Sequence, residues 1–306
     1  MFSRKKAFLS ILLVLVLVTL GIVGYIGKIY IDIRATVNGS YEAIERTETE
    51  LDYLSGDPFS ILLLGTDGGD LEREERGRTD TLIVATVNPK KAITTLVSLP
   101  RDTYTAIIDQ DINDKINHAY AYGGVSSTLS TVENLLDIPI DYYAQIDLKG
   151  MKELVDLVGG IEVNNAFTFH YEGVDFPIGK LQLDGESARK YARMRYEDPE
   201  GDYGRQKRQR QVLTGFLDQA RAVGTLVNYK GMLEVIGENI QTNISWETSQ
   251  MLFKHYRTAL TYVNSDQLMG VGFTGDGVTG EQGISYQMIP EEELVRVQNE
   301  LKEQLK

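Results

Sequence analysis

The sequence contains no cysteine among its 306 residues. Disulfide bridges, thiolate metal sites and cysteine nucleophiles are therefore all excluded. Histidine is also scarce, and the three that occur are scattered at His118, His170 and His255, which argues against a zinc site built from histidines. Positive charge is in deficit, because 31 Lys and Arg face 44 Asp and Glu and give a formal net charge of −13. Such a chain lacks the basic field that general nucleic-acid binding needs, so we expect no nucleic-acid partner.

The N-terminus carries the one long apolar run. Three basic residues, Arg4, Lys5 and Lys6, precede an uncharged stretch over residues 7–27, and about 20 apolar residues are enough to cross a bilayer as a helix. The basic flank predicts a cytoplasmic N-terminus. A cleaved signal peptide is the alternative, but the run is long for one and no Ala-x-Ala site follows it.

The topology expected from this pattern is a single-pass protein of the cell membrane. Residues 1–6 are the predicted cytoplasmic N-terminus, residues 7–27 the transmembrane helix and residues 28–57 a polar extracellular tether. Residues 58–306 then form one extracellular domain. The lipid bilayer is an expected partner through the N-terminal helix.

The order of apolar patterns predicts an α/β fold. Three strands are expected early, at residues 61–64, 79–87 and 92–102, the last two joined as a hairpin by the turn at residues 88–91. Helices and strands then alternate: we expect helices at 125–136, 148–158, 184–193, 203–223, 246–260 and 290–305, and strands at 140–147, 161–163 and 267–273. This mixture predicts a central mixed sheet with helices on both faces, a three-layer α/β/α arrangement preceded by the transmembrane helix.

Charged residues of both signs cluster at the ends of the first three strands. If these strands run antiparallel, the end of the first, the start of the second and the end of the third meet at one rim of the sheet. The residues at those positions are Asp67, Arg78, Asp80, Arg101 and Asp102. Residues far apart in sequence are therefore expected to form one site.

A second concentration of arginine lies at residues 189–210, in an otherwise acidic chain. Helical spacing continues the apolar stripe of residues 203–223 back through Gln209 and Arg205, and points Arg210 away from it. Arg205 would then face inward at a helix N-terminus, which favours an anion. Its counter-charge is either a carboxylate of Asp198 or Asp202, which is a purely structural role, or a phosphate group on a ligand.

Carboxylates that hold a metal ion and arginines that bind phosphate are typical of sites that catalyse phosphoryl transfer. Asp67 and Asp80 are oxygen donors suited to Mg²⁺, which usually takes one or two carboxylates and leaves its other positions to water and phosphates. Arginine matches phosphate oxygens with two parallel hydrogen bonds. Catalysis of this reaction is mostly positioning and charge stabilisation.

Seven short motifs occur in order over roughly residues 58–223. They read GTD (65–67), RTDTLIV (78–84), SLPRDT (98–103), KINHAYAYGG (115–124), VGGIEV (158–163), LDGESARKYARMRY (183–196) and GDYGRQKRQRQ (201–211). Together they resemble the motif set of the LytR-CpsA-Psr family of cell-wall glycopolymer ligases. The resemblance implies an α/β/α domain that binds a polyprenyl-pyrophosphate glycan, with its lipid tail in an apolar tunnel. It also implies transfer of wall teichoic acid, capsule or a similar polymer to a peptidoglycan acceptor.

The resemblance also implies roles for individual residues. Asp67 and Asp80 would hold Mg²⁺, for which Mn²⁺ could substitute. The pyrophosphate would be bound by Arg78, Arg101, Arg193, Arg195, Arg205 and Gln209. Asp202 would orient the neighbouring arginines or cap the helix. Arg101 and Asp80 would act in catalysis, and Asp102 is a candidate general base that could equally hold its turn in shape.

Two alternatives to transfer remain at this point. Water in place of a sugar hydroxyl would make the protein a hydrolase of polyprenyl-pyrophosphate glycans. A wall-polymer receptor or regulator without catalysis is the other alternative.

Overall fold

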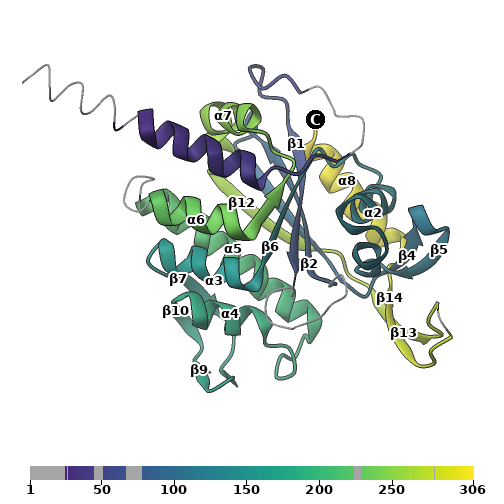
Figure 1. Cartoon of the computed structure of the whole chain (residues 1–306). Coiled ribbons are helices and arrows are strands. Elements are labelled where there is room, and N and C mark those ends of the chain that lie inside the picture. Colours follow the sequence, from purple (N-terminus) through teal and green to yellow (C-terminus); the bar gives the residue numbers. More distant parts are fainter. Residues whose placement is uncertain (1–24, 26, 45–50, 67–77, 224–228, 279) are drawn as a thin grey trace, which may run out of the picture.

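Six strands form a central sheet in the order β11-β6-β1-β2-β3-β12 (Figure 1). The computed structural model describes residues 25, 27–44, 51–66, 78–223, 229–278 and 280–306. Along the sheet the strands are β11 (Ile240–Thr242), β6 (Tyr142–Asp147), β1 (Phe59–Thr66), β2 (Thr79–Asn88), β3 (Ile93–Leu99) and β12 (Tyr262–Gln267).

The sheet is mixed, as expected. Strands β1, β2 and β3 are antiparallel neighbours, whereas β6 runs parallel to β1 and β12 runs parallel to β3. The turn between β2 and β3 is fixed by Asn88, whose side-chain oxygen accepts a 3.0 Å hydrogen bond from the backbone of Lys91. The antiparallel order brings the end of β1, the start of β2 and the end of β3 to one rim of the sheet, which confirms the predicted convergence.

Side chains alternate between the two faces of the sheet with the period of two that a strand imposes. On one face, Leu82 and Val84 pack with Leu129 of α2 (His118–Leu136) and Val297 of α8 (Glu291–Gln304). On the other face, Ile83 and Ala85 pack against Leu213 of α5 (Asp202–Val223). Helices thus cover both faces, and the three-layer arrangement is the one expected (Figure 1).

A second apolar cluster joins α5 to the helices and hairpins below the sheet. This region contains α3 (Leu148–Leu157), β7 (Ile161–Asn165), β8 (Phe169–Tyr171), β9 (Val174–Phe176), β10 (Gly179–Leu183) and α4 (Gly185–Arg193). Asp184 caps α4 by accepting a hydrogen bond from the backbone of Ser187, as its position before an apolar-periodic segment predicts. The remaining elements are β4 (Tyr104–Ile107), η1 (Ile108–Gln110), β5 (Ile112–Lys115), α6 (Tyr229–Asn239), α7 (Trp246–His255), η2 (Arg257–Leu260), β13 (Val271–Gly275) and β14 (Ile284–Met288).

Several predicted elements are wrong in extent. The strand expected at residues 267–273 is two strands, β12 and β13, because Gly270 separates them. The helix expected to start at residue 125 starts at His118, with a kink at Gly124, whose φ of 67° and ψ of −149° lie outside the helical region. The helix expected at residues 246–260 is divided into α7 and η2.

The predicted tether also contains regular structure. Residues 27–40 are helical, and the helix rests on the α/β unit through an edge contact between the rings of Tyr30 and Trp246, with centroids 5.3 Å apart. The hydroxyl of Ser40 donates to the backbone oxygen of Ile236, 3.1 Å away. In the described part of the chain no helix has the length and apolar character to cross a membrane. Apart from residues 25 and 27, the predicted transmembrane helix lies outside that part.

Candidate phosphate-binding site

The rim at the end of β1 collects the acidic and basic residues that the sequence predicts there. Thr66 at the end of β1 pairs with Thr79 at the start of β2, and Leu82 of β2 pairs with Leu99 at the end of β3. This register places Asp80 beside the turn that carries Arg101. Asp67, the other predicted metal ligand, follows Thr66 directly and lies outside the described residues.

Arg101 and Asp80 form an ion pair across this rim. Their side chains keep 21% and 37% of their exposure, so both can be reached from solvent. Burial acts to lower the pKa of Arg101, but neighbouring carboxylates outweigh burial and raise it above its ordinary value. Those carboxylates belong to Asp80, Asp202 and Asp102. Arg101, in the turn after β3, therefore interacts electrostatically with Asp202 of α5.

Asp102 has a second cationic partner that the sequence did not indicate. Nζ of Lys115, at the end of β5, lies 2.7 Å from Oδ1 of Asp102, while Nε of Arg101 lies 3.9 Å from Oδ2. The backbone N–H of Asn117 donates to the carbonyl oxygen of Arg101 at 3.2 Å. These contacts bring the KINHAY segment against the Pro-Arg-Asp turn. The only signal in the sequence was that Lys115 begins one of the family motifs.

Asp202 lies between two of the predicted pyrophosphate-binding arginines. Its Oδ1 is 2.7 Å from Nη2 of Arg205 and 3.7 Å from Nε of Arg195. Arg205 is nearly buried, and its Nε has no hydrogen-bond partner among the described residues. Burial lowers the pKa of Arg205, Asp202 opposes this, and the positive charge of Arg101 adds to the lowering. Arg101, Arg195 and Arg205 therefore form one electrostatic cluster around Asp202.

Two other arginines of α5 are structural. Arg208 forms a buried ion pair with Asp198 and donates from Nε to the backbone oxygen of Tyr191 at 2.9 Å. Arg210, predicted to point away from the core, is 5% exposed. Its Nη1 lies 2.5 Å from the hydroxyl of Ser98, and burial lowers its pKa to about 10. The prediction for Arg210 was wrong because α5 is covered on more than one side, by the sheet and by α4, whereas a single apolar stripe implied one covered face.

The remaining predicted residues lie at the edges of the cluster. Arg193, in the last turn of α4, has Nη1 3.8 Å from Glu172 of the β8–β9 turn. Arg78 is exposed, and its charge acts on the hydroxyl of Tyr122 in α2. Gln209 is half-buried, one turn after Arg205 on α5. The structure thus gathers Arg101, Arg195 and Arg205 around Asp202, whereas the interactions given for Arg78 and Arg193 are with Tyr122 and Glu172.

The carboxylates at this rim fit a metal ion that takes most of its ligands from water and substrate phosphates. The described residues contain no group of three or more metal-binding side chains. Asp80 is a partly exposed carboxylate beside the arginine cluster, and Asp67 adjoins the same rim in sequence. This matches the requirements of Mg²⁺, which is commonly held by one or two carboxylates together with substrate phosphates.

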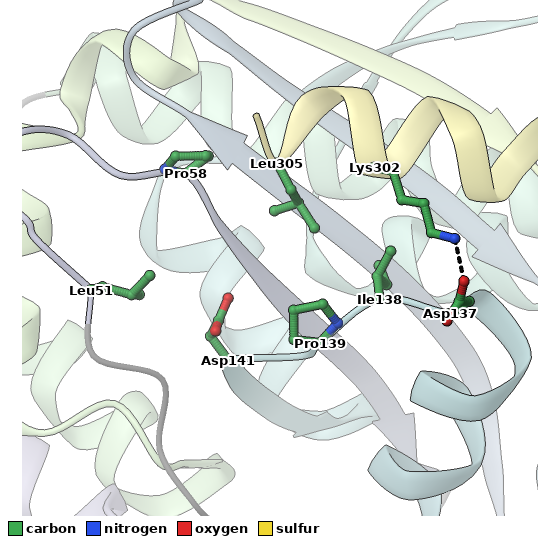
Figure 2. Close-up of a pocket in the computed structure, with 8 residues that line it drawn as sticks. All are labelled: Leu51, Pro58, Asp137, Ile138, Pro139, Asp141, Lys302 and Leu305. Carbon is green, nitrogen blue, oxygen red and sulfur yellow. Dashed lines mark hydrogen bonds and ion pairs between the residues drawn. The ribbon is translucent and has the colours of Figure 1, made fainter.

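Among the described residues, one cavity lies near the start of β1 and another near its end. Figure 2 shows the first, of about 320 Å³. Its lining residues are Leu51, Pro58, Asp137, Ile138, Pro139, Asp141, Lys302 and Leu305. A cavity of about 240 Å³ lies at the functional rim, where it is lined by Thr66, Tyr120, Gln145, Asp147, Glu238, Asn239 and Gln241. This cavity therefore borders the rim at Thr66, and none of the described site residues lines it.

Comparison with known proteins places the chain in a family. Residues 28–303 match the LytR_cpsA_psr family. Over 306 residues the chain is 48% identical to a protein of Enterococcus faecalis named polyisoprenyl-teichoic acid–peptidoglycan teichoic acid transferase TagU, covering 100% of this chain and 99% of that protein. The crystal structure of Bacillus subtilis TagU superposes with a TM-score of 0.64 at 40% identity, covering 82% of this chain and 97% of that one.

A ligand-bound relative has the same fold. The structure of TagT bound to LI-WTA superposes with a TM-score of 0.70 at 29% identity, covering 87% of this chain and 99% of that one. The family match over most of the sequence and the relative that is 48% identical along the whole chain agree with the seven ordered motifs. The protein belongs to the LytR_cpsA_psr family.

Proposed function

We propose that this phosphotransferase moves a glycopolymer, such as wall teichoic acid or a capsule polymer, from a polyprenyl-pyrophosphate carrier to peptidoglycan, which it joins through a phosphodiester. The observation that carries the proposal is the cluster of Arg101, Arg195 and Arg205 around Asp202, next to Asp80. The names of the relatives support the same reaction, since TagU is a teichoic acid transferase and TagT is seen with LI-WTA.

A diphosphate would complete the charge balance of this cluster. Arg205 is 8% exposed at the side chain, and one carboxylate, that of Asp202, faces both it and Arg195. Buried guanidinium groups are costly without a counter-charge. Phosphate oxygens placed among the three arginines would accept hydrogen bonds, including one from the unpartnered Nε of Arg205.

Asp80, with Asp67 beside it in sequence at the rim, would hold Mg²⁺. When bound, the ion supplies positive charge that neutralises the phosphate oxygens. Arg101, already paired with Asp80, is positioned to contribute charge from the protein side. Removal of Mg²⁺ with a chelator should stop transfer, and adding Mg²⁺ back should restore it.

The lipid-linked pyrophosphate supplies its own activated bond, so no nucleotide is required. The acceptor hydroxyl on peptidoglycan attacks the phosphorus nearest the glycan. The bond from that phosphorus to the bridging oxygen breaks, and polyprenyl phosphate leaves. Arg101, Arg195 and Arg205 stabilise the negative charge that develops on the phosphate oxygens.

This reaction would take place at the outer face of the cell membrane. The apolar run of residues 7–27, with its basic flank, supports a single-pass anchor whose N-terminus is cytoplasmic. Protease added to intact protoplasts should remove the folded domain. Protection of the domain in that assay would contradict the proposed orientation.

The function is tested with Arg101→Ala in purified enzyme supplied with lipid-linked polymer and peptidoglycan fragments. Loss of an arginine that stabilises a phosphoryl-transfer transition state costs about 10³–10⁵ in rate. We expect a loss in that range with an unchanged circular-dichroism spectrum. Lys207→Ala is the control, because Lys207 lies on α5 but is exposed, with a 4.0 Å contact to Glu200. Transfer by Arg101→Ala at near wild-type rate would refute the proposal.

Mass spectrometry of the products separates transfer from hydrolysis. Glycan phosphate linked to the peptidoglycan fragment is the expected product of the wild-type enzyme. Free glycan phosphate, unchanged in amount when acceptor is added, would mean that water is the acceptor.

A further inference from the structure

Asp114, His118 and Tyr122 form a hydrogen-bonded group that the proposed function does not yet use. The carboxylate of Asp114, on β5, is 3% exposed. Its Oδ2 lies 2.7 Å from Nδ1 of His118 and accepts a 2.8 Å hydrogen bond from the hydroxyl of Tyr122. Both partners stand on the first part of α2, before the kink at Gly124. The backbone φ of 67° at Gly124 lets this short segment depart from the axis of the rest of α2.

This group lies beside the phosphate-binding cluster. Asn117, the residue before His118, donates its backbone N–H to the carbonyl oxygen of Arg101. Lys115, the residue after Asp114, contacts Asp102. Figure 1 shows β4, β5 and α2 together on one side of the sheet.

The pKa of Tyr122 is affected by Arg78, one of the arginines predicted to bind the pyrophosphate. Burial raises the pKa of Tyr122 to about 12, the hydrogen bond to Asp114 adds to this, and the positive charge of Arg78 opposes it. Arg78 therefore lies close enough to act on the Asp114 group. The group borders the cluster on two sides, through the Arg101 turn and through the start of β2.

The contact between Asp114 and His118 defines the chemistry of the imidazole. A buried carboxylate can only accept, so Nδ1 of His118 carries the proton and Nε2 keeps its lone pair. The same contact fixes the orientation of the ring, with Nε2 on the side away from Asp114. The side chain of His118 is 18% exposed, so the ring is not sealed inside the protein.

Asp102, the alternative base, is less suited to this task. Its Oδ1 is paired with Lys115 at 2.7 Å, and the charge of Arg101 lies 3.9 Å from its Oδ2. Protonating Asp102 would remove the counter-charge of both cations. Its contacts fit the other role considered for it, which is to hold the Pro-Arg-Asp turn.

We propose that His118 is the general base for the acceptor hydroxyl and that Asp114 is its positioning residue; the proposal rests on the transferase function above. Nε2 of His118 takes the proton from the acceptor hydroxyl while the oxygen forms its bond to the glycan-side phosphorus. The bond to the bridging oxygen breaks with its electron pair, and polyprenyl phosphate leaves as an anion. The proton then returns to solvent from the imidazolium.

The decisive variant is His118→Gln in the full chain, compared with wild type for transfer rate, affinity for the lipid-linked donor and melting temperature. General-base catalysis is worth about 10²–10⁴ in rate. We expect kcat to fall by that factor while donor affinity and melting temperature are kept. Imidazole added to His118→Ala should restore part of the rate. Asp114→Asn should lower kcat less than His118→Gln does and should not respond to imidazole.

His170→Gln is the matched control. His170 makes the same kind of contact, with Nδ1 2.7 Å from Asp175, but its side chain is 60% exposed on the β8–β9 hairpin. We expect this variant to transfer polymer at the wild-type rate.

Three results would overturn the proposal. One is a rate for His118→Gln within threefold of wild type. The second is a loss of rate matched by an equal loss of donor affinity or by a lowered melting temperature, since that describes a structural role. The third is a rate of His118→Ala that added imidazole does not restore, since that result would show that the lost function is not proton transfer. Failure of the wild-type enzyme to transfer polymer to any acceptor refutes the proposed function instead, so the two failures are distinguishable.

Discussion

The carboxylate of Asp198 is paired with the guanidinium of Arg208 in the interior of the protein, where the two side chains keep 2% and 4% of their exposure. Arg208 also donates to the backbone oxygens of Tyr191 and Met194, at the end of α4. One side chain of α5 therefore fixes both α4 and the loop that carries Arg195. Arg208 therefore has a structural role in this segment, whereas Arg195 and Arg205 are the arginines of the proposed ligand site.

Asp198→Asn should be strongly destabilising. The substitution keeps the shape of the side chain but leaves the charge of Arg208 buried without compensation, which costs about 3–5 kcal/mol. Urea unfolding followed by circular dichroism measures this free energy. Glu200→Gln is the control, because its contact with Lys207 is exposed on both sides and should be worth less than about 1 kcal/mol. Equal stability of the two variants would contradict the structural role of Arg208.

Gly204→Ala should disturb the same ion pair from the other side. A Cβ atom at Gly204 would lie 1.9 Å from Oδ2 of Asp198, so either the carboxylate or the start of α5 has to move. We expect a loss of stability of about 1–3 kcal/mol, as for other overpacked sites, measured by thermal unfolding. Gly39→Ala is the matched control, since Gly39 is helical and nothing lies within 4 Å of an added Cβ. That variant should be neutral or more stable, by up to about 1 kcal/mol.

The sequence predicted the central sheet well because each early strand is bounded by turn residues. The apolar run that ends at Gly65 and the Asn88–Lys91 turn place β1, β2 and β3 to within a few residues. The hairpins β4–β5 and β8–β9 were missed, and of β13–β14 only part of β13 was predicted. Their strands are three to five residues long, and so short a segment does not show a period of two clearly. The start of α2 was missed because Gly123 and Gly124 look like a stop, whereas the chain kinks there and continues as a helix.

The candidate site was predictable where antiparallel pairing alone determines it. Asp80 and Arg101 come together because β2 and β3 share a rim. The distinction between Arg205 and Arg208 was not predictable, since both face inward, and which one meets Asp198 depends on the path of the loop between α4 and α5. Lys115 and Asp114 were missed because they belong to a short hairpin whose position against the Arg101 turn is a tertiary feature.

Tyr30→Ala should loosen the helix of residues 27–40 from the α/β unit. Tyr30 packs edge-on against Trp246, and such aromatic pairs contribute about 0.5–1.5 kcal/mol beyond the area they bury. The chain has a single tryptophan, so its fluorescence reports the surroundings of Trp246. We expect emission to shift to longer wavelength as Trp246 becomes exposed, with little change in the unfolding of the central sheet. Ile31→Ala is the control, because Ile31 lies in the same helix with 65% of its surface exposed, and it should leave the spectrum unchanged. An unchanged spectrum for Tyr30→Ala would contradict the docking of this helix.

Asp202→Asn should make the stability of the protein depend on an added anion. The carboxylate of Asp202 is the counter-charge nearest Arg205 and also faces Arg195. Without it, the guanidinium of Arg205 stays buried and feels the like charge of Arg101, so we expect a loss of about 1–3 kcal/mol in the absence of ligand. Inorganic pyrophosphate supplies the missing negative charge and should raise the melting temperature of Asp202→Asn by more than it raises that of wild type.

Asp218→Asn serves as the control, because the contact between Asp218 and Arg221 lies on the exposed part of α5. The response of this variant to pyrophosphate should equal that of wild type. A pyrophosphate shift that is the same in all three proteins would show that the anion binds somewhere other than the cluster around Asp202.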